Sequence, residues 1–538
     1  MTEHYKRAAV VQFGYERSPD QDATSVPRHR VVVVGAGPVG LATAIDLAQR
    51  NVPVVLLDDA DRIGEGSRGL CYSKRALEIL DRLGAGAPVV DKGVSWKIGK
   101  VFFRDEQVYQ FDLLPEAGHK MPAFVNLQQY YLEQYLVERV QQLDLIDLRW
   151  RNKVSGVEQL NDGARLSVDT PEGPYQLEAD YVIAADGARS TVRALLGLEF
   201  VGQTFQDQFL IIDIKMKADM PTERRFWFEP PFHGGQSALL HKQPDDVWRL
   251  DFQIGPEADA EAEQAPERVK ARVAGMMGAR DYELVWGSVY KFQCRRLERF
   301  RHGRIFFAGD SAHQVSPFGA RGANSGLEDA ENIAWKLALV LNGDADDRLL
   351  DTYEIERIQA ADMNIGHSTR STDFISPKSA AEVGFRNAVL SLSRTAAFAR
   401  RMVNSGRLST PATYDTPLST PDRDRFGGSA NLGAPLPDAP MRKNGKDIWL
   451  LNALDQRFNL LYVKNGTAPR VPDGVALQVI GEELQDADGW FAKRFDATPG
   501  ACYLVRPDQH LTARFRHGDE DGIAAALQRA RGAEGEAR

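Results

Sequence analysis

Residues 28–59 read RHRVVVVGAGPVGLATAIDLAQRNVPVVLLDD and contain the pattern that decides the fold. The four β-branched residues Val31 to Val34 predict a strand that is buried on both faces. Three glycines in GxGxxG spacing follow this strand: Gly35, Gly37 and Gly40. In this spacing the first glycine permits a tight turn, the second lets the backbone approach a pyrophosphate, and the third lets the next helix pack closely on the strand.

The residues after the glycines complete a strand–helix–strand unit. We expect a helix from Leu41 to Arg50 and a second buried strand from Val52 to Leu57, which ends in Asp58. A carboxylate at this strand end can accept a hydrogen bond from a ribose hydroxyl, and the helix N-terminus presents unpaired amides to phosphates. The unit predicts an adenine-dinucleotide site in a parallel α/β sheet, with a chance glycine turn as the alternative.

Composition limits the class of protein. The chain has 538 residues, 43% of them hydrophobic, which is enough for two to four domains of ordinary globular composition. Its net charge of −9 argues against a nucleic-acid surface. The three cysteines are far apart and form no CxxC, so we expect neither disulfides nor a metal site, in a reducing compartment. No apolar run is long enough for a signal peptide or a membrane span, so we expect a cytoplasmic protein with a loosely ordered leader at residues 1–27.

Two segments after Asp58 carry weaker signals. Arg68 stands in a glycine-rich loop, where it either clamps a pyrophosphate or is a solvated surface residue. A helix is expected from Leu127 to Leu143, with Asn126 as its cap and Gln128 in its first turn. Gln128 is uninformative without a wider context.

The middle of the chain changes from buried strands to alternating ones. The run Tyr181 to Ala185 ends in Asp186 and Gly187, which mark either another ligand-facing strand end or an ordinary turn. From Phe209 to about Phe292, aromatic-rich segments alternate with period two, with no helix expected between them. This pattern predicts an antiparallel sheet that is inserted into the nucleotide domain and offers one face to a substrate.

A third strand, at residues 305–308, ends in Gly309 and Asp310, whose carboxylate can accept from a polyol chain. We expect the next helix to start at about Ser325, with a capping box completed by Glu328. The unpaired amides at such a helix start would stabilise negative charge on a bound ring, and a reduced flavin carries that charge.

Three motifs stand in the order of one family: GAGPVG at 35–40 followed by Asp58, AADGARS at 184–190, and AGDSAHQVSPFGARGANSG at 308–326. The chain resembles the single-component flavin aromatic hydroxylases of the p-hydroxybenzoate hydroxylase fold, in particular the branch of phenol hydroxylases and 3-(3-hydroxyphenyl)propionate hydroxylases. The resemblance covers roughly residues 28–535. It implies an α/β fold with a Rossmann-like FAD-binding domain, an inserted antiparallel β-sheet substrate domain and a C-terminal thioredoxin-like domain.

The resemblance also implies which residues bind FAD. It implies that the adenosine half is held by Gly35, Gly37, Gly40 and Asp58, and the pyrophosphate region by Arg68 and Gln128. It assigns the position shared by FAD and a transient nicotinamide to Asp186 and Gly187, the ribityl chain to Asp310, and the flavin ring to Pro317. Further cofactor contacts are Gly309, Gly322 and Asn324.

Two parts of the sequence bear on the substrate. The family more often reads GGQGMNTG where this chain has GARGANSG, so Arg321 is either a second anchor for an anionic ring or a surface residue. The segment SVYKFQCR at 288–295 resembles the phenol hydroxylase segment whose tyrosine meets the substrate hydroxyl. Tyr290 inherits this catalytic role, or it is a packed strand aromatic. Further pocket candidates on the alternating strands are Phe226, Trp227, His241 and Arg249.

The expected domains follow these motifs. The FAD-binding domain covers 28–405 and contains the inserted sheet at about 200–296, and a linker rich in Pro, Ser, Thr and Gly covers 406–445. The thioredoxin-like domain at 446–538 lacks CxxC, which excludes dithiol chemistry and leaves a packing role or a contact in a possible homodimer.

The implied function is hydroxylation of a phenolic compound ortho or para to its hydroxyl, through a flavin hydroperoxide, with O2 and with NADH or NADPH as cosubstrate. One alternative is an FAD-dependent oxidase, epoxidase or halogenase of the same fold, although the lysine motif typical of the halogenases is absent. The other is a non-catalytic nucleotide-binding protein, which the colour of the purified protein would distinguish.

Overall fold

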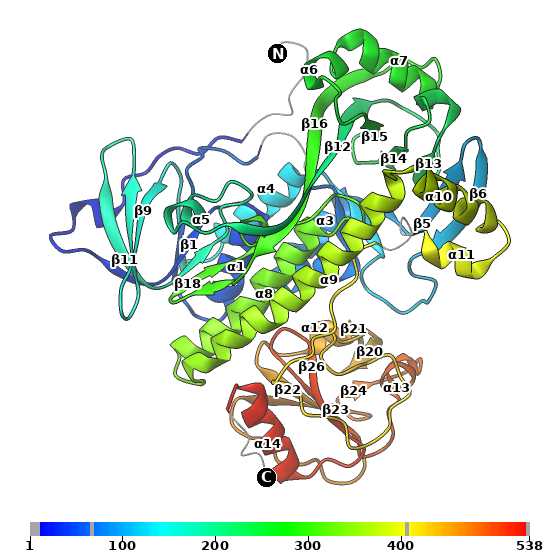
Figure 1. Ribbon diagram of the computed structural model, residues 1–538. Helices are drawn as coiled ribbons and strands as arrows, with labels where there is room; N and C mark the ends of the chain where they lie inside the picture. The colour runs from blue at the N-terminus through cyan, green and yellow to red at the C-terminus, as the bar shows by residue number, and fades with distance from the viewer. Residues whose placement is uncertain (1–10, 65–68, 404–407, 534–538) are drawn as a thin grey trace.

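The computed structural model describes residues 11–64, 69–403 and 408–533. Figure 1 shows a parallel-sheet domain, a second large sheet and a C-terminal domain. The long helices α8 (Gly322–Leu341) and α9 (Asp351–Ile375) cross the centre of the molecule, and the C-terminal domain lies beneath them. No helix of the described residues is long and apolar enough to cross a membrane.

The first sheet contains the predicted parallel core. The strands run β17 (Arg301–His302), β18 (Ile305–Phe307), β11 (Tyr175–Ala184), β1 (Arg28–Val34), β2 (Val54–Leu57) and β8 (Ile146–Arg149) across the sheet. From β18 to β8 every pair is parallel, as the sequence predicts for an α/β nucleotide domain. The antiparallel strands β9 (Lys153–Gln159) and β10 (Ala164–Asp169) extend β11 on one side.

Helices cover this sheet and bury its centre. Val31, Val32 and Val33 have no exposed surface, which explains the unbroken β-branched run. The helix after the glycine turn, α1 (Pro38–Gln49), begins three residues before the predicted Leu41, because Pro38 is already suited to a first helical position. The other helices of this domain are α2 (Lys74–Leu83), α3 (Gly86–Lys92), α4 (Gln129–Val140) and α5 (Thr191–Leu195).

The second sheet runs in the order β19, β16, β12, β15, β14, β13, β5, β6. The bounds are β19 (His313–Gln314), β16 (Glu283–Leu297), β12 (Phe200–Lys215), β15 (Val247–Ile254), β14 (Ala238–Lys242), β13 (Arg224–Phe228), β5 (Ile98–Phe103) and β6 (Glu106–Asp112). It is antiparallel as predicted except where β13 pairs with β5 in parallel. Strands β5 and β6 join it from well before residue 200.

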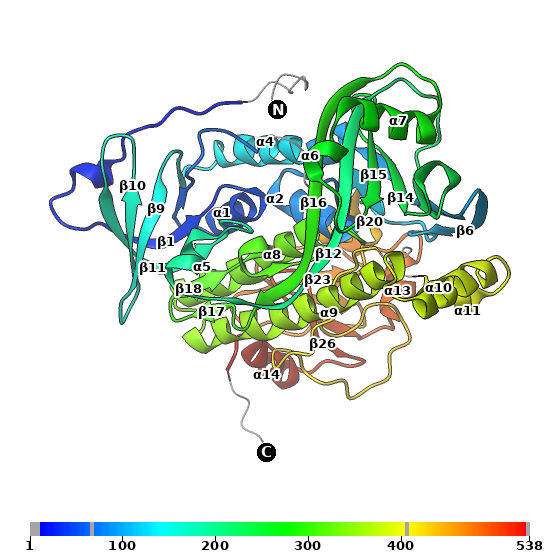
Figure 2. The same cartoon turned by 45° about the horizontal axis from the view of Figure 1, so that its top comes forward.

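The prediction that no helix interrupts these strands was wrong. Helices α6 (Ala260–Glu263) and α7 (Pro266–Met277) lie between β15 and β16. Val269, Val273 and Met277 of α7 pack on the outer face of the sheet. Figure 2 shows α7 beside β15. The helical period in this segment is short and polar, so the surrounding strand pattern concealed it.

The opposite, inner face of the second sheet is directed towards the rest of the molecule. Its apolar side chains pack with the end of α9, with α10 (Ala380–Leu392) and α11 (Ala397–Met402), and with Phe318. A small sheet formed by β3 (Cys71–Ser73), β7 (Phe124–Asn126) and β4 (Val94–Trp96) lies on the nucleotide-domain side.

Two predicted helix caps were wrong. Asn126 ends β7, and Gln128 occupies the N-cap position of α4. Helix α8 begins at Gly322, with Arg321 at its N-cap position and no side-chain cap. Ser325 is therefore inside the helix, and its hydroxyl accepts from Arg357 at 2.9 Å. A serine near a helix start can bond to tertiary partners as well as to its own amides.

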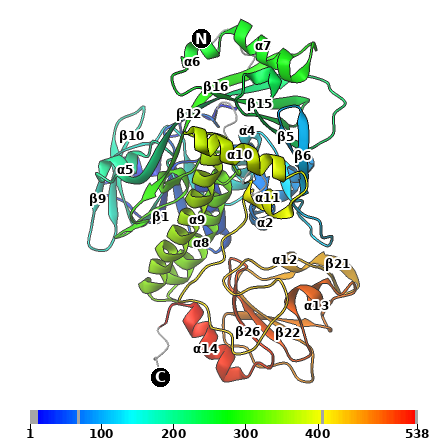
Figure 3. The same ribbon diagram turned by 45° about the vertical axis from the view of Figure 1, so that its right-hand side comes forward.

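The C-terminal part forms a sheet in the order β21, β20, β24, β23, β22, β25, β26. Its elements are β20 (Pro440–Lys443), β21 (Lys446–Trp449), α12 (Leu450–Ala453), β22 (Phe458–Val463), β23 (Val475–Ile480), β24 (Leu484–Gln485), α13 (Trp490–Phe495), β25 (Cys502–Val505), β26 (Leu511–Phe515) and α14 (Glu520–Ala530). β20 already pairs within this sheet before the expected boundary at 446. Figure 3 shows α12 on the side nearest the nucleotide domain.

Candidate functional site

Four strand ends lie side by side at one edge of the first sheet. Val34 of β1 pairs with Ala184 of β11 and with Leu57 of β2, and Ala184 pairs with Phe307 of β18. The residues that follow these strands are therefore neighbours at the carboxyl edge, where ligands bind in open α/β sheets. They are four of the residues singled out from the sequence: Gly35, Asp58, Asp186 and, two residues after Phe307, Gly309.

The three glycines of the turn are required for different reasons. Gly35 has φ of +104°, and a Cβ there would lie 2.6 Å from the carbonyl oxygen of Ala185. A Cβ on Gly40 would lie 1.8 Å from the carbonyl oxygen of Gly35, so both positions depend on close backbone packing. Among the described residues, no atom lies within 4 Å of a Cβ placed on Gly37. The space beside Gly37, at the N-terminus of α1, fits the approach of a pyrophosphate.

Asp58 makes contacts within the protein that the sequence did not predict. Its Oδ2 accepts from the Ala36 amide at 2.5 Å, and its Oδ1 accepts from the Ala60 amide at 2.8 Å. Burial raises the pKa of Asp58, and the two amides oppose this shift. The carboxylate thus orders the glycine turn, and its remaining lone pairs can still accept from a ribose.

Asp186 and Gly187 form the next strand end. Gly187 has φ of +75°, which turns the chain away from β11. Asp186 Oδ2 accepts from the Val192 amide at 3.0 Å, while its buried Oδ1 has no hydrogen-bond partner among the described residues. Burial raises the pKa of Asp186. A buried acceptor without a partner in the protein fits a hydrogen bond from a bound nucleotide.

The turn after β18 is held by a buried network that the sequence analysis missed. The Gly309 amide donates to Asp329 Oδ2 at 2.8 Å, and His313 Nε2 lies 2.6 Å from the same oxygen. Arg357 Nε donates to the other oxygen of Asp329 at 2.5 Å. The side chain of Asp310 is exposed beside this network. Charged residues within an apolar helical stripe, such as Asp329 in α8, were the available signal.

The start of α8 joins the turn region to the small sheet. Asn324 is fully buried, its Oδ1 accepts from the Ser73 amide at 3.0 Å, and its Nδ2 donates to the Cys71 carbonyl at 3.0 Å. Gly322 is the first residue of α8, and Pro317 is exposed in the preceding loop. The two interpretations of Arg321 are now distinguishable, because its side chain is only 2% exposed and is therefore not a surface residue.

The two residues assigned to the pyrophosphate region differ in what can be said of them. Arg68 lies outside the described residues. Gln128 is 2% exposed, and its Nε2 donates to the Pro244 carbonyl at 3.3 Å, in the turn between β14 and β15. Its Oε1 has no partner among the described residues. In this structure Gln128 thus connects the nucleotide domain to the second sheet.

The inner face of the second sheet meets the loop before α8. Phe318 of this loop lies with its ring centroid 4.9 Å from that of Phe209 and 5.4 Å from that of Phe292. Tyr290 is two residues before Phe292 on β16 and thus on the same face, with its ring 6.1 Å from Trp286. Tyr290 is therefore next to the loop that contains Pro317. Trp227 packs on the outer face with Phe232, so its prediction as a pocket residue was wrong.

The inner face also carries a cluster of ionisable side chains, the inner-face cluster: Asp213, Arg224, His241, Arg249 and Asp251. Arg249 and Asp213 form a buried ion pair, with Arg249 Nη2 2.8 Å from Asp213 Oδ2. Burial raises the pKa of Asp251 to about 7, although Arg249 opposes this shift. Burial lowers the pKa of His241 well below its ordinary value. The period-two pattern contained Arg224 and Asp251, but only the register shows that they share the apolar face.

The raised pKa of Asp251 predicts a pH dependence of stability. The unfolded side chain ionises near pH 4, so the contribution of Asp251 to the free energy of unfolding falls as the pH rises from about 4 to about 7 and is level above that. Asp251→Asn removes this loss, and we expect the variant to be more stable than wild type by on the order of 2–4 kcal/mol above pH 7 but not below pH 4. Denaturant unfolding at several pH values measures it. Asp246→Asn, an exposed change in the turn between β14 and β15, is the control. A difference in stability that does not vary with pH would contradict the prediction.

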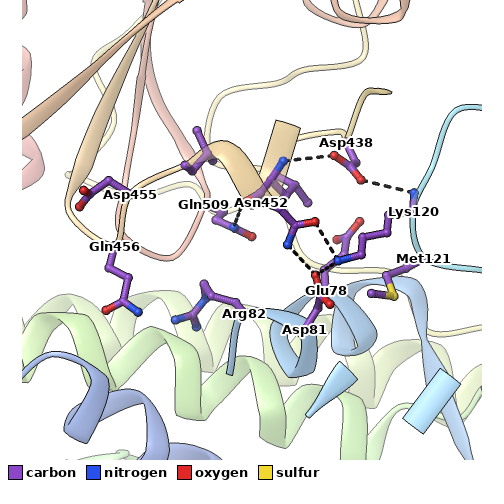
Figure 4. Close-up of a pocket in the computed structure, with 12 residues that line it drawn as sticks. Glu78, Asp81, Arg82, Lys120, Met121, Asp438, Asn452, Asp455, Gln456 and Gln509 are labelled. Atoms are coloured by element: carbon purple, nitrogen blue, oxygen red, sulfur yellow. Dashed lines mark hydrogen bonds and ion pairs between the residues drawn. The ribbon is translucent and has the colours of Figure 1, made fainter. Parts of the chain in front are cut away.

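A separate cavity of about 200 Å³ lies between α2 and the C-terminal domain (Figure 4). Lys120 Nζ bridges Asp81 Oδ2 at 2.6 Å and Asn452 Oδ1 at 2.8 Å there. Its lining is polar and includes none of the residues singled out from the sequence for cofactor or substrate. We therefore assign this cavity to the domain interface.

Comparisons with known proteins agree with this geometry. Residues 28–368 match the family model described as FAD binding domain. The chain belongs to this FAD-binding family. It is 30% identical over 535 residues to 6-methylpretetramide 4-monooxygenase of Streptomyces rimosus, covering 93% of each chain. It is 28% identical over 532 residues to 3-(3-hydroxy-phenyl)propionate/3-hydroxycinnamic acid hydroxylase of Burkholderia cenocepacia, covering 93% of this chain and 96% of that one.

A similarity to a solved structure extends over almost the whole chain. The crystal structure of the flavin-dependent monooxygenase PieE in complex with FAD and substrate matches with a TM-score of 0.79 at 23% identity, covering 95% of this chain and 100% of that one. The resemblance predicted from three motifs is therefore confirmed. This member of the family is an FAD-dependent aromatic monooxygenase, with FAD as cofactor and NAD(P)H and O2 as cosubstrates.

Proposed function

We propose that this enzyme hydroxylates a phenolic compound ortho or para to its hydroxyl, on the inner face of the second sheet. One observation carries the proposal: Phe318, in the loop that leads into α8, packs on Phe209 and Phe292 of that face. The loop therefore brings together the cofactor edge of the first sheet and the strand that contains Tyr290. A relative of similar length is named as a hydroxylase of 3-(3-hydroxy-phenyl)propionate, which is a phenol.

The cofactor residues keep the roles that the sequence resemblance implies. We assign the adenosine half of FAD to Gly35, Gly37, Gly40 and Asp58, supported by the open space at Gly37. The remaining contacts, for the pyrophosphate region, the nicotinamide position, the ribityl chain and the flavin ring, are Arg68, Gln128, Asp186, Gly187, Gly309, Asp310, Pro317, Gly322 and Asn324. The role of Asp186 is supported by its Oδ1, which has no partner among the described residues. Asn324 accepts from the Ser73 amide and so fixes the start of α8 against the small sheet.

Asp310 gives a direct test of the ribityl assignment. Asp310→Ala removes one charge-assisted hydrogen bond, so we expect FAD to bind roughly ten- to a hundredfold more weakly, equivalent to about 1.5–3 kcal/mol. Equilibrium titration of apoprotein with FAD measures this. Asp344→Ala, an exposed change after α8, is the control. An unchanged dissociation constant in Asp310→Ala would mean that the carboxylate faces elsewhere.

The protein's own contribution to the reaction is to orient the phenol, to help remove its proton and to exclude water. The cofactor supplies the redox chemistry, because reduced FAD activates O2. We assign the contact with the substrate hydroxyl to Tyr290. Its phenol can accept or donate a hydrogen bond at the edge of an aromatic wall formed by Trp286, Phe209 and Phe292.

Tyr290→Phe tests this assignment, because it removes a hydroxyl and leaves the ring packing. We expect normal FAD content but oxygen transfer slowed tenfold to a thousandfold, a shifted pH optimum and more NAD(P)H lost as hydrogen peroxide. Product and peroxide yields per NAD(P)H consumed measure the coupling. Tyr282→Phe, on the α7 side, is the matched control. Coupling and a pH profile equal to wild type would make Tyr290 a packed aromatic.

We also propose the domain organisation stated from the sequence, in a cytoplasmic protein. The C-terminal unit is assigned as thioredoxin-like, supported by the parallel pair β22–β23 beside the antiparallel pair β25–β26. Cys502 is buried and burial raises the pKa of its thiol to about 11, so a packing role, in the monomer or in a homodimer, is the better assignment.

The experiment that tests the function is NADH and NADPH consumption by the purified enzyme with a panel of phenols, with product and peroxide measured. We expect one nicotinamide to be preferred, and at least one phenol to stimulate its oxidation with formation of a catechol or hydroquinone. Stimulation without a hydroxylated product would favour an oxidase or epoxidase.

A further inference from the structure

Arg224 is a buried arginine without a partner. It is 5% exposed at the first residue of β13, and none of the described residues forms a hydrogen bond or an ion pair with its guanidinium. Arginine is almost never buried unless it is paired, because moving its charge out of water is costly. The other buried arginine of the inner-face cluster, Arg249, donates to both carboxylate oxygens of Asp213 through Nε and Nη2. Arg224 therefore has unused capacity for an anion.

The groups around Arg224 do not neutralise it. His241 lies on the neighbouring strand, its Nδ1 has no partner among the described residues, and burial keeps it uncharged near neutral pH. Asp251 Oδ1 is likewise buried without a partner, and burial keeps this carboxyl largely protonated below pH 7. Cys71 stays a thiol because burial raises its pKa to about 11. Below pH 7 these side chains are mostly neutral and include hydrogen-bond donors, so a negatively charged oxygen is the group that the site then lacks.

The position of this cluster connects it to the cofactor site. Cys71 is close enough to Arg224, Arg249 and Asp251 for their charges to affect its thiol. The carbonyl of Cys71 accepts from Asn324 at the start of α8. Trp96, from the small sheet, adds an aromatic side chain 6.3 Å from His241 between ring centroids. The unpaired arginine is thus on the substrate-facing side of the second sheet, next to the residues assigned to the flavin.

We propose that Arg224 anchors an oxyanion of the substrate, so that the phenol hydroxylated here carries a second, acidic group, either a carboxylate or an ionised enol. This inference rests on the proposed function, because it assigns a specificity residue to the same site. Arginine suits the role because its planar fork can hold both oxygens of a carboxylate or of an enolised dicarbonyl. A bound anion would also remove the cost of the unpaired buried charge.

The test compares charged and neutral ligands on the FAD-loaded enzyme. The probes are 3-(3-hydroxyphenyl)propionate, its primary amide, and anhydrotetracycline as an acidic enol. Each is titrated into the enzyme, and binding is followed by the change in the flavin absorption spectrum. We expect at least one acid to bind wild type tenfold or more tightly than the amide, and this advantage to disappear in Arg224→Gln. Arg225→Gln is the matched control, because the next side chain points to the other face, is 25% exposed and pairs with Glu223. The acid that responds identifies the carboxylate or the enol as the natural group.

A second measurement needs no ligand. Arg224→Met replaces an unpaired buried charge by an apolar side chain, so we expect the thermal unfolding midpoint of the variant to rise above that of wild type. A lower midpoint or lost FAD would show that Arg224 serves the fold or the cofactor and would overturn the proposal. So would equal binding of acid and amide to wild type, or no response to either acid. If acids bind through Arg224 but no phenol is hydroxylated, the proposed function fails while the anion site stands.

Discussion

Glu356→Ala is expected to destabilise the enzyme by about 3–5 kcal/mol, because it leaves buried Lys336 without an anion and leaves buried Arg506 with Asp508 alone. Glu356 of α9 has no exposed surface. Its Oε1 accepts from Arg506 Nη1 at 2.6 Å and from Thr416 at 2.7 Å, and its Oε2 accepts from Lys336 Nζ at 2.8 Å. Burial alone would raise the pKa of Glu356, but Arg506 and Lys336 outweigh it and lower the pKa. The carboxylate is therefore ionised, and its hydrogen bonds join α8, α9, the linker through Thr416, and the C-terminal domain.

Denaturant unfolding and limited proteolysis measure the effect of Glu356→Ala. Asp362→Ala is the matched control, because Asp362 is on the same helix and pairs with Arg296 at 2.6 Å, but its side chain is 54% exposed. An exposed pair contributes about 0–1 kcal/mol, so this variant should unfold nearly as wild type does. We expect proteolysis of Glu356→Ala to begin in the linker, at residues 408–439, where the chain forms no helix. Equal stability of the two variants would mean that the C-terminal domain is held by its other contacts.

The features predictable from the sequence were those with local signals. The β-branched run and the glycine spacing of β1 and α1 arise from burial and from close backbone approach, and both can be recognised in a short segment. That β18, β11, β1 and β2 share one parallel sheet was expected, because each of these strands ends in a polar residue or glycine. The family resemblance then supplied a cofactor that no periodicity could identify.

The features that could not be predicted depend on contacts between distant segments. The role of Asp329 depends on Arg357 and on the Gly309 amide, which are 28 and 20 residues away. The unpaired state of Arg224 depends on the register of three strands, since a shift of one residue would place it on the outer face. The cap at Ser325 was predicted wrongly because a local capping pattern competed with Arg357, a partner that only the fold supplies.

We expect Gly37→Val to fold but to purify without FAD, and therefore colourless, because the change affects the cofactor space and not the packing of the protein. The backbone at Gly37 is extended, with φ of −76° and ψ of −179°, a conformation that any residue can adopt. A Cβ there meets no atom of the described part of the chain within 4 Å, so the branched side chain extends into the space assigned to the pyrophosphate. Losing glycine at this N-cap position costs at most about 1 kcal/mol.

Gly40→Val is the contrast that makes the Gly37 result interpretable. Its Cβ would lie 1.8 Å from the Gly35 carbonyl oxygen, so this variant should fail to fold and not merely lose FAD. The ratio of flavin to protein absorbance gives the cofactor content, and circular dichroism with thermal unfolding of the apoproteins gives the folded state. If Gly37→Val bound FAD stoichiometrically, the pyrophosphate would not pass this turn. If Gly37→Val failed to fold, as expected for Gly40→Val, Gly37 would be a packing residue. The open space beside Gly37 would then not be explained by a bound pyrophosphate.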